Sequence, residues 1–156
     1  MENPYRAPNL VTQAPFVYGG ESLVDHRGAC IITEGELKAR AAIQLGLPAI
    51  ALPGMNSSRQ VAADLLAARQ VRLVYVIFDT DARLSKEDKP KSVYVDHAVE
   101  TLTERLGQRD LHTARVTLPL LGEQKMDLDR YILLMGPAAL EELRRMAREA
   151  RDGIPA

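Results

Sequence analysis

Residues 71–81 read VRLVYVIFDTD, a stretch that is apolar from 71 to 78 apart from Arg72 and that ends on two aspartates separated by one residue. The run is rich in β-branched and aromatic side chains and lacks the polar alternation of a half-exposed strand. It therefore predicts a β-strand that is covered on both faces, as in a parallel sheet flanked by helices. If the backbone stays extended beyond the strand, Asp79 and Asp81 point to the same side.

The segments around this strand alternate between short apolar runs and helical periodicity. Residues 29–33, 49–52 and 114–118 predict three more buried strands. Helices are expected over residues 37–45, from a cap at Asn56, Ser57 or Ser58 to residue 68, over 95–106, from Asp127 or Asp129 to 134, and over about 138–150. This order predicts an α/β fold with a mainly parallel four-stranded sheet flanked by helices.

Composition limits the class of protein. The chain has 156 residues and a formal net charge of −1, so no global basic excess indicates a nucleic-acid or membrane binder. No apolar run approaches the roughly 18–20 residues that span a bilayer, and the N-terminus lacks the pattern of a signal peptide. The single cysteine, Cys30, excludes an internal disulfide and a cysteine-rich zinc ribbon. We therefore expect a cytoplasmic protein without membrane contact.

The chain is expected to comprise an N-terminal arm or lead-in segment over residues 1–26 and one folded domain over residues 27–156. Three prolines within the first 15 residues make a long helix there unfavourable. Residues 16–18 read FVY and could form a short edge strand. Regular alternation of strands and helices begins only after this segment.

Acidic residues follow three of the predicted strands. The carboxylates expected at this edge are Glu34, Asp79, Asp81, Asp127 and Asp129. In open α/β sheets, ligands bind outside the carboxyl ends of the strands. Carboxylate oxygens suit Mg²⁺, which usually takes one or two protein carboxylates together with water and phosphate. The sequence therefore predicts a Mg²⁺ (or Mn²⁺) site at this edge.

Each acid also has a structural interpretation. Asp79 and Asp81 could simply end the strand or cap the loop that follows it. Glu34 could be a favourable acid in the first turn of a helix. Asp127 or Asp129 could be the N-cap of the short helix.

Three further residues are candidates for contact with a phosphate: Lys125, Lys38 and Gly35. Gly35 allows close backbone approach or an unusual backbone conformation. Lys38 could instead be an i,i+4 partner of Glu34. Lys125 could equally be a solvated loop lysine.

Three segments together resemble a known domain. They are IITEGELKARAAIQLGLPAIALPG at 31–54, VYVIFDTDA at 74–82 and KMDLDRYI at 125–132. They are similar to the TOPRIM domain, and most closely to the primase-like TOPRIM domains of phage and plasmid (mobile-element) replication proteins. The resemblance covers about residues 29–150, and it implies the TOPRIM-type, Rossmann-like arrangement of the sheet.

The resemblance also implies roles for the acids. Glu34 matches the family's glutamate, proposed as general acid/base in strand transfer or polymerisation. Asp79 and Asp81 match the aspartates that bind Mg²⁺. Asp127 and Asp129 match the later acidic pair of the primase-like branch.

The implied function is Mg²⁺-dependent chemistry on nucleic-acid phosphodiesters or nucleotides, in DNA replication or primer synthesis. The implied partners are DNA or RNA, nucleotides, and a helicase or other primase domains. One cysteine excludes the zinc-binding domain of a bacterial-type primase, and 156 residues leave no room for its polymerase subdomain. A nucleotidyltransferase, a TOPRIM nuclease and a non-catalytic docking module of a larger primase-helicase therefore all remain open. A receiver-like domain is a further alternative, disfavoured by Glu34-Gly35.

Overall fold

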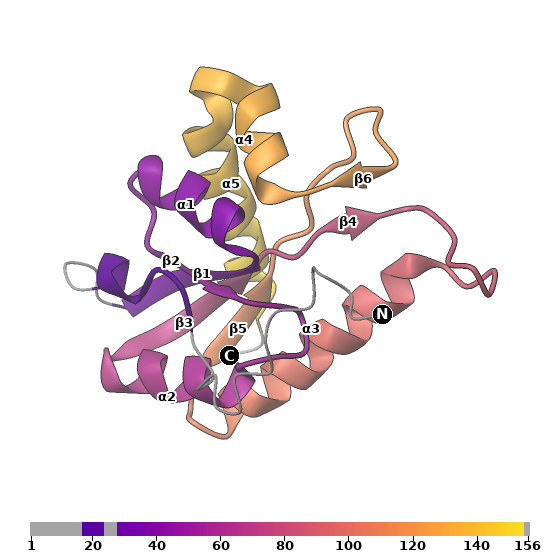
Figure 1. Ribbon diagram of the computed structural model, residues 1–156. Helices are drawn as coiled ribbons and strands as arrows, with labels where there is room; N and C mark the ends of the chain where they lie inside the picture. The colour runs from indigo at the N-terminus through magenta and orange to yellow at the C-terminus, as the bar shows by residue number, and fades with distance from the viewer. Residues whose placement is uncertain (1–16, 24–27, 155–156) are drawn as a thin grey trace, which may run out of the picture.

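The computed structural model describes residues 17–23 and 28–154, and a four-stranded parallel sheet lies at its centre (Figure 1). The sheet has the order β2-β1-β3-β5. Its strands are β1 (Gly28–Glu34), β2 (Ala49–Leu52), β3 (Val71–Val76) and β5 (His112–Arg115). Every neighbouring pair runs parallel, which confirms the predicted fold class.

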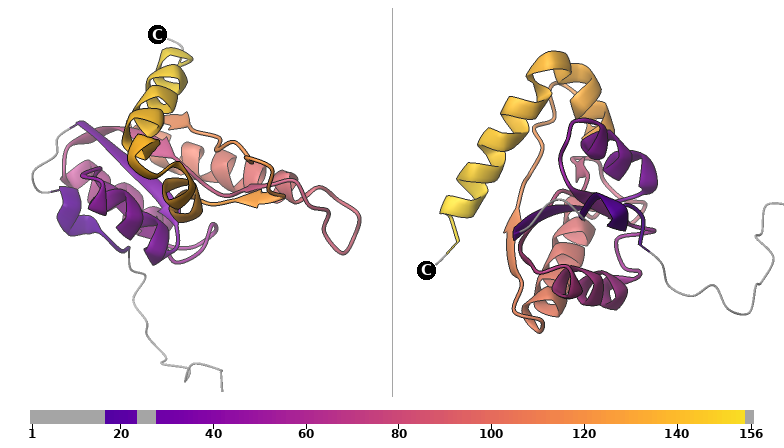
Figure 2. Two further views of the ribbon diagram at one scale, coloured as in Figure 1. Left: turned by 90° about the horizontal axis from the view of Figure 1, so that it is seen from above. Right: turned by 90° about the vertical axis from the view of Figure 1, so that its left-hand side faces the viewer.

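Helices cover both faces of the sheet (Figures 1 and 2). One face carries α1 (Glu36–Gln44), α4 (Leu128–Met135) and α5 (Ala139–Asp152), and the other carries α2 (Arg59–Ala68) and α3 (Lys91–Gly107). A short 3₁₀ turn, η2 (Gly136–Ala138), joins α4 to α5. In Figure 2, α5 leans outward from the sheet toward its C-terminal end. Among the described residues, none of the helices combines the length and the apolar character that a membrane crossing needs.

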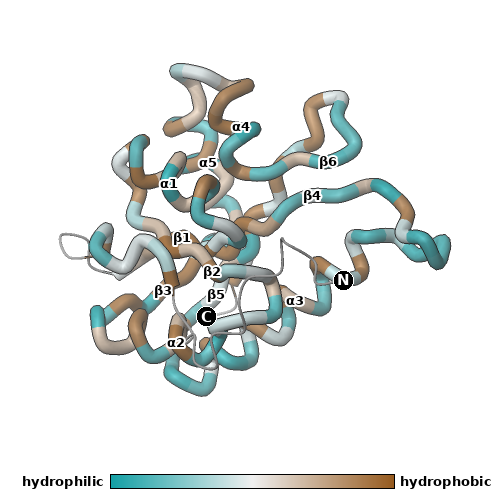
Figure 3. The backbone as a smooth tube through the Cα atoms, in the orientation of Figure 1, coloured by the Kyte–Doolittle hydropathy of each residue, from teal (hydrophilic) through white to brown (hydrophobic). Residues whose placement is uncertain are grey.

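The apolar residues form two cores, one on each face of the sheet. Successive residues of a strand point to opposite faces, so each strand supplies both cores. Ile31 packs with Tyr131 and Leu143 on one face, whereas Ile32 packs with Leu66 and Leu102 on the other. Side-chain burial on both faces explains why these strands read as continuous apolar runs. In Figure 3 the central strands β1 and β3 carry much of the brown, whereas the loop from β4 to α3 is mostly teal.

A second, two-stranded sheet was not predicted. The strands β4 (Thr80–Asp81) and β6 (Lys125–Met126) pair antiparallel, with Asp81 opposite Lys125. The hydroxyl of Thr80 also donates a hydrogen bond of 2.7 Å to the carbonyl oxygen of Leu118. This pairing brings Lys125 next to the Asp-x-Asp segment, although more than 40 residues separate them in the sequence.

Three local expectations need correction. The strand predicted over 71–78 ends at Val76, and the one predicted over 114–118 occupies residues 112–115. Hydrogen bonds to the neighbouring strand continue one residue beyond each end. The amide of Ile77 donates to the carbonyl of Ile32 at 2.9 Å, and the amide of Val116 donates to the carbonyl of Val76 at 3.0 Å. Ser58 is the N-cap of α2, but its backbone is left-handed (φ 56°) and its side chain forms no capping hydrogen bond.

Part of the N-terminal segment packs on the sheet. Tyr18 exchanges backbone hydrogen bonds of 3.1 and 2.9 Å with Ala51, antiparallel to β2. The 3₁₀ helix η1 (Gly20–Leu23) follows, and Leu23 is buried in the core beside α2. The edge strand predicted over 16–18 is therefore represented by one bridge at Tyr18, and Phe16 lies outside the described residues.

The strand order creates a switch point between β1 and β3. From β1 the chain first moves outward to β2 and then returns to form β3 on the other side of β1. The helices that follow β1 and β2 lie on opposite faces, which leaves a crevice at the carboxyl ends of β1 and β3. Glu34 ends β1, and Asp79 and Asp81 come shortly after β3.

Candidate functional site

A cavity of about 580 Å³ lies at this switch point. Glu34, Lys38, Asp79, Asp81 and Lys125 all contribute to its wall. The remaining lining residues are Met55, Arg83, Ser85, Lys86, Glu87, Lys91, Tyr94 and Val95. Three segments that are distant in the sequence therefore meet in one space, as the position of the acids predicts.

A glycine positions Glu34 at the rim of the cavity. Gly35 is the N-cap of α1, and it has φ 90° and ψ 139°, a region that side chains other than glycine strongly disfavour. Its amide donates a hydrogen bond of 2.8 Å to the carbonyl of Leu52. The chain therefore turns sharply from β1 into α1 directly after Glu34, which is partly exposed.

We expect Gly35→Ala to destabilise the protein by about 1–3 kcal/mol, because a Cβ at this φ and ψ is strained. Nothing lies within 4 Å of the added Cβ, so the effect is conformational and does not arise from a clash. Gly107→Ala is the matched control, since this glycine ends α3 without a positive φ and its added Cβ also meets open space. Urea unfolding measures both variants, and equal midpoints would contradict the assignment of strain to Gly35.

Asp79 is enclosed by two lysines. It is 9% exposed, and Lys38 Nζ lies 3.0 Å from its Oδ1 and donates a hydrogen bond of 3.3 Å to its Oδ2. Lys125 Nζ lies 3.4 Å from Oδ2. Burial lowers the pKa of Lys38, but the charge of Asp79, a hydrogen bond to it, and the charges of Glu34 and Asp127 outweigh burial and raise it. Lys38 thus stays a cation and pairs with Asp79 and not, as the sequence also allowed, with Glu34.

Asp81 is held by an arginine from its own loop. Arg83 donates from Nε and Nη2 to the two carboxylate oxygens at 2.8 Å each, and its backbone amide donates at 3.1 Å. The side-chain hydrogen bonds of Arg83 are the largest cause that lowers the pKa of Asp81 to about 2, against the opposing effect of burial. The Arg83 side chain is 40% exposed, whereas that of Asp81 is 9% exposed.

We expect Arg83→Gln to raise the pKa of Asp81 from about 2 toward its ordinary 3.8, because the variant loses the charged side-chain hydrogen bonds of Arg83 while burial remains. A lowered carboxyl pKa stabilises the folded state above the unfolded pKa, and this stabilisation disappears as pH falls through the folded pKa. The variant should therefore lose stability relative to wild type above pH 4, and the difference should vanish as pH falls toward 2.

The carboxyl-carbon shift of Asp81 in an NMR titration measures this effect directly. Arg145→Gln is the control, because Arg145 pairs at 2.8 Å with Glu142 in an ion pair on the surface of α5 and does not line the cavity. An Asp81 that still titrates near 2 in Arg83→Gln would show that another group sets its pKa.

Asp127 and Asp129 lie at the start of α4 and do not line the cavity. Asp127 is the N-cap, and its carboxylate accepts a hydrogen bond of 3.0 Å from the amide of Arg130. Burial raises the pKa of both aspartates, but hydrogen bonds from Asp129 and Arg130 and the charges of Lys38 and Lys125 lower that of Asp127. The pKa of Asp129 is raised by burial and by the neighbouring Asp127.

The carboxylates of this cavity match only the smallest set of protein ligands with which Mg²⁺ is commonly bound. Mg²⁺ is commonly bound by one or two protein carboxylates, with water and substrate phosphate as its other ligands. Asp79 and Asp81 line one cavity, and Oδ1 of Asp79 is buried without a hydrogen bond. Within residues 17–23 and 28–154, however, no group of three or more His, Cys, Asp or Glu side chains is arranged to hold a metal ion. A cation here would share Asp79 with two lysines and would have to displace Arg83 from Asp81.

Arg83 and Tyr94 are cavity residues that the sequence did not single out for the site. Arg83 stands two residues after Asp81, a spacing at which one side chain can reach back to the other. Tyr94 begins α3 and is 46% exposed. The sequence feature that could have identified Tyr94 is the position of an aromatic residue close to the lysines of the polar loop.

The arrangement defines a class, an α/β domain with a mixed acidic and basic cavity at the switch point of a parallel sheet. A family model described as "Domain of unknown function (DUF3854)" matches residues 21–139, and the chain belongs to this family. None of the curated proteins matches the chain.

Among solved structures, the fold is similar to the crystal structure of the Aquifex aeolicus primase (zinc binding and RNA polymerase domains). The two share 23% sequence identity with a TM-score of 0.58. The match covers 85% of this chain but 28% of the primase chain, so the chain spans little more than a quarter of that protein. At this identity the match shows a shared fold, in agreement with the predicted primase-like arrangement.

Proposed function

We propose that this chain is a primase-like TOPRIM domain that acts with Mg²⁺ or Mn²⁺ on nucleic-acid phosphodiesters or on nucleotides. The observation that carries the proposal is that Glu34, Asp79 and Asp81 line one cavity together with Lys38 and Lys125. Carboxylates for a metal, a carboxylate for proton transfer and cations for a phosphate are the groups that phosphoryl transfer requires.

Each residue has a distinct role in this proposal. Asp79 and Asp81 would hold the cation, which would neutralise phosphate charge and stabilise the attacking or leaving oxygen. Glu34 would exchange a proton with the leaving or attacking 3′-oxygen. Lys38 and Lys125 would contact a phosphate oxygen while keeping the carboxylate of Asp79 oriented. Gly35 would let the phosphate approach the backbone at the start of α1.

Asp127 and Asp129 would act as a later acidic pair that supports this site. Asp127 already reaches it electrostatically, since its charge raises the pKa of Lys38. They do not line the cavity, and the carboxylate of Asp127 accepts a hydrogen bond from the amide of Arg130 as the N-cap of α4.

The likeness of the fold to a primase supports a role in DNA replication, and the resemblance of the sequence extends the proposal to a mobile element such as a phage or plasmid. The partners would be DNA or RNA, nucleotides, and a helicase or other primase domains, in the cytoplasm. Extended products would indicate primer synthesis, and shortened products would indicate strand cleavage.

One observation favours a second candidate, a non-catalytic docking module. Asp79 is paired with Lys38 and Lys125, and Asp81 is paired with Arg83, so both carboxylates are neutralised without a metal. Such a domain would bind nucleotide or nucleic acid for another protein and would turn nothing over.

The two candidates differ in an assay with purified protein, Mg²⁺ or Mn²⁺, labelled nucleoside triphosphates and single- or double-stranded DNA. Catalysis predicts metal-dependent extension or cleavage that EDTA and Asp79→Asn both abolish. Asp64→Asn is the control, because Asp64 forms an exposed ion pair with Arg109 outside the carboxylate cavity. Binding without turnover would establish the docking module in place of the enzyme.

A further inference from the structure

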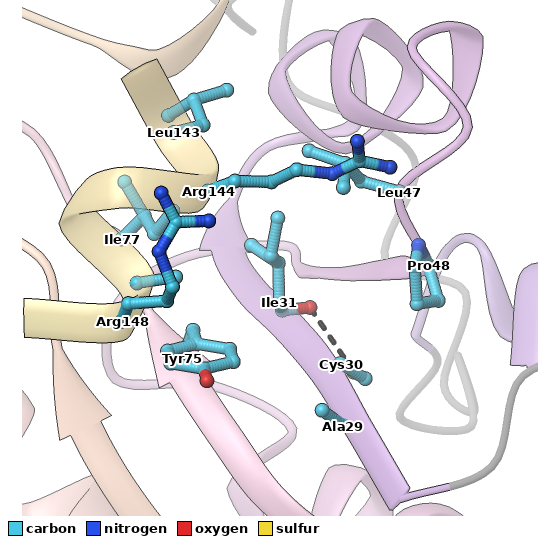
Figure 4. Close-up of a pocket in the computed structure, with 11 residues that line it drawn as sticks. Ala29, Cys30, Ile31, Leu47, Pro48, Tyr75, Ile77, Leu143, Arg144 and Arg148 are labelled. Carbon is cyan, nitrogen blue, oxygen red and sulfur yellow. Dashed lines mark hydrogen bonds between the residues drawn. The ribbon is translucent and has the colours of Figure 1, made fainter. Parts of the chain in front are cut away.

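A second cavity, of about 250 Å³, lies between α5 and the strands β1 and β3 of the sheet (Figure 4). Its floor is apolar and is formed by residues of β1, β3 and the loop before β2. The lining residues are Ala29, Cys30, Ile31, Leu47, Pro48, Tyr75, Ile77, Leu143, Arg144, Ala147 and Arg148. It shares no residue with the carboxylate cavity.

Two arginines stand over this apolar floor. Arg144 and Arg148 are one helical turn apart, so they project from the same side of α5. In Figure 4 the side chain of Arg144 passes above Ile31 and ends beside Leu47, and the guanidinium group of Arg148 lies beside Ile77 and Tyr75. Within the described part of the chain, Arg144 has no ion pair, and Arg148 has one contact of 3.5 Å, to the exposed Glu141. Their charges are thus available to a ligand.

The neighbouring Arg145 provides a contrast. It donates to Glu142 and Glu149 at 2.8 Å each, so its charge is already matched on the helix surface. It does not line the cavity. The acidic residues of α5 therefore form short ion pairs with Arg145, which faces away from the cavity, and leave the two arginines that face the cavity less neutralised.

Size and chemistry point to the occupant. Sites for small molecules usually measure about 300–1,000 Å³, and this cavity is smaller, which suits one anchoring side chain. Tyr75 and the two arginines carry the polar side-chain groups of this cavity in the described structure, because the Cys30 side chain is buried in the core on the other face of the sheet. A nucleobase would therefore lose most of its hydrogen bonds there. A large aliphatic or aromatic side chain would fill the floor, and an adjacent carboxylate would match the arginines.

We propose that this cavity docks a peptide segment of a partner protein in which a large apolar side chain lies next to an acidic residue. The apolar side chain would enter the space between Ile31, Tyr75 and Leu143. The acidic side chain would pair with Arg144 and Arg148 at the rim. This proposal stands independently of the reaction at the carboxylate cavity.

Selection from a displayed peptide library against the full chain tests the proposal, followed by fluorescence anisotropy of the enriched peptides. We expect enriched sequences that combine Leu, Ile, Phe or Trp with an adjacent Asp or Glu. Arg144→Gln with Arg148→Gln should weaken their binding by about tenfold or more, which is ~1.4 kcal/mol. Ala147→Leu, which fills the cavity with hydrocarbon, should weaken it as well. Arg145→Gln should leave the affinity unchanged.

Four outcomes would overturn the proposal. They are a selection without enrichment, enriched peptides without an acid, binding that the double arginine variant retains, and displacement of the peptide by a second copy of the chain or by a nucleotide. Circular dichroism of each variant establishes that it is folded. Because the arginine side chains are exposed, the double variant gives a readout even if Ala147→Leu disturbs the packing of α5.

Discussion

Glu34→Gln is expected to lower metal-dependent turnover by about 10²–10⁴-fold, the range that a positioned general acid or base contributes. The amide keeps the size and hydrogen-bonding capacity of the side chain but cannot exchange a proton at neutral pH. Substrate affinity should change little, since Lys38 and Lys125 remain in the cavity wall.

Glu36→Gln is the matched control, because this exposed acid lies in the first turn of α1 and does not line the cavity. It should retain full activity. If Glu34→Gln were equally active, Glu34 would have no role in proton transfer. The cavity would then act through its cations and the two aspartates alone.

Leu102→Ala should lower the free energy of unfolding by about 2–5 kcal/mol, because it removes most of a buried side chain and leaves a cavity. Leu102 is 0% exposed and packs in the core between the sheet and helices α2 and α3. Urea unfolding monitored by circular dichroism measures the change.

Leu133→Ala provides the comparison, since the same substitution falls on a side chain that is 79% exposed on α4. We expect a change within about 0.5 kcal/mol there. Similar losses in the two variants would mean that α3 does not cover the sheet in the way described.

Much of the fold could be predicted because burial leaves a clear periodic signal. The parallel strands are covered on both faces, so residues such as Ile31 and Ile32 form a continuous apolar run although they face different cores. The N-cap role of Asp127 was one of the predicted alternatives, since a short polar side chain directly before an apolar helical run is typical of a cap. The structure confirms both features.

Other features depend on contacts between distant segments and have no local signal. The strands β4 and β6 have two residues each, too few for a periodicity, and they exist because each supplies a partner to the other. The predicted cap at Ser58 was wrong in its chemistry, because the turn places that residue in the left-handed region. No local sequence pattern distinguishes β4 and β6 from ordinary loops, or the left-handed Ser58 from an ordinary cap.

The candidate site shows the same division. The position of strand ends predicts that Glu34, Asp79 and Asp81 meet, and these three line one cavity. The ion pair of Lys38 with Asp79 could not be predicted from the sequence, because Asp79 comes within reach of Lys38 only when β3 lies beside β1. The bidentate contact of Arg83 with Asp81 likewise depends on the bend of the loop after β4.

Binding of Mn²⁺, followed by electron paramagnetic resonance with and without a nucleotide, tests the central claim most directly. The claim predicts that wild-type protein binds Mn²⁺, that Mg²⁺ competes for it, and that Asp79→Asn weakens binding by about tenfold or more, ~1.4 kcal/mol. Asp64→Asn should bind as wild type does, because Asp64 lies in an exposed ion pair outside this cavity. An absence of binding under both conditions, or binding that Asp79→Asn leaves unchanged, would contradict the assignment of this cavity as a metal-dependent phosphate site.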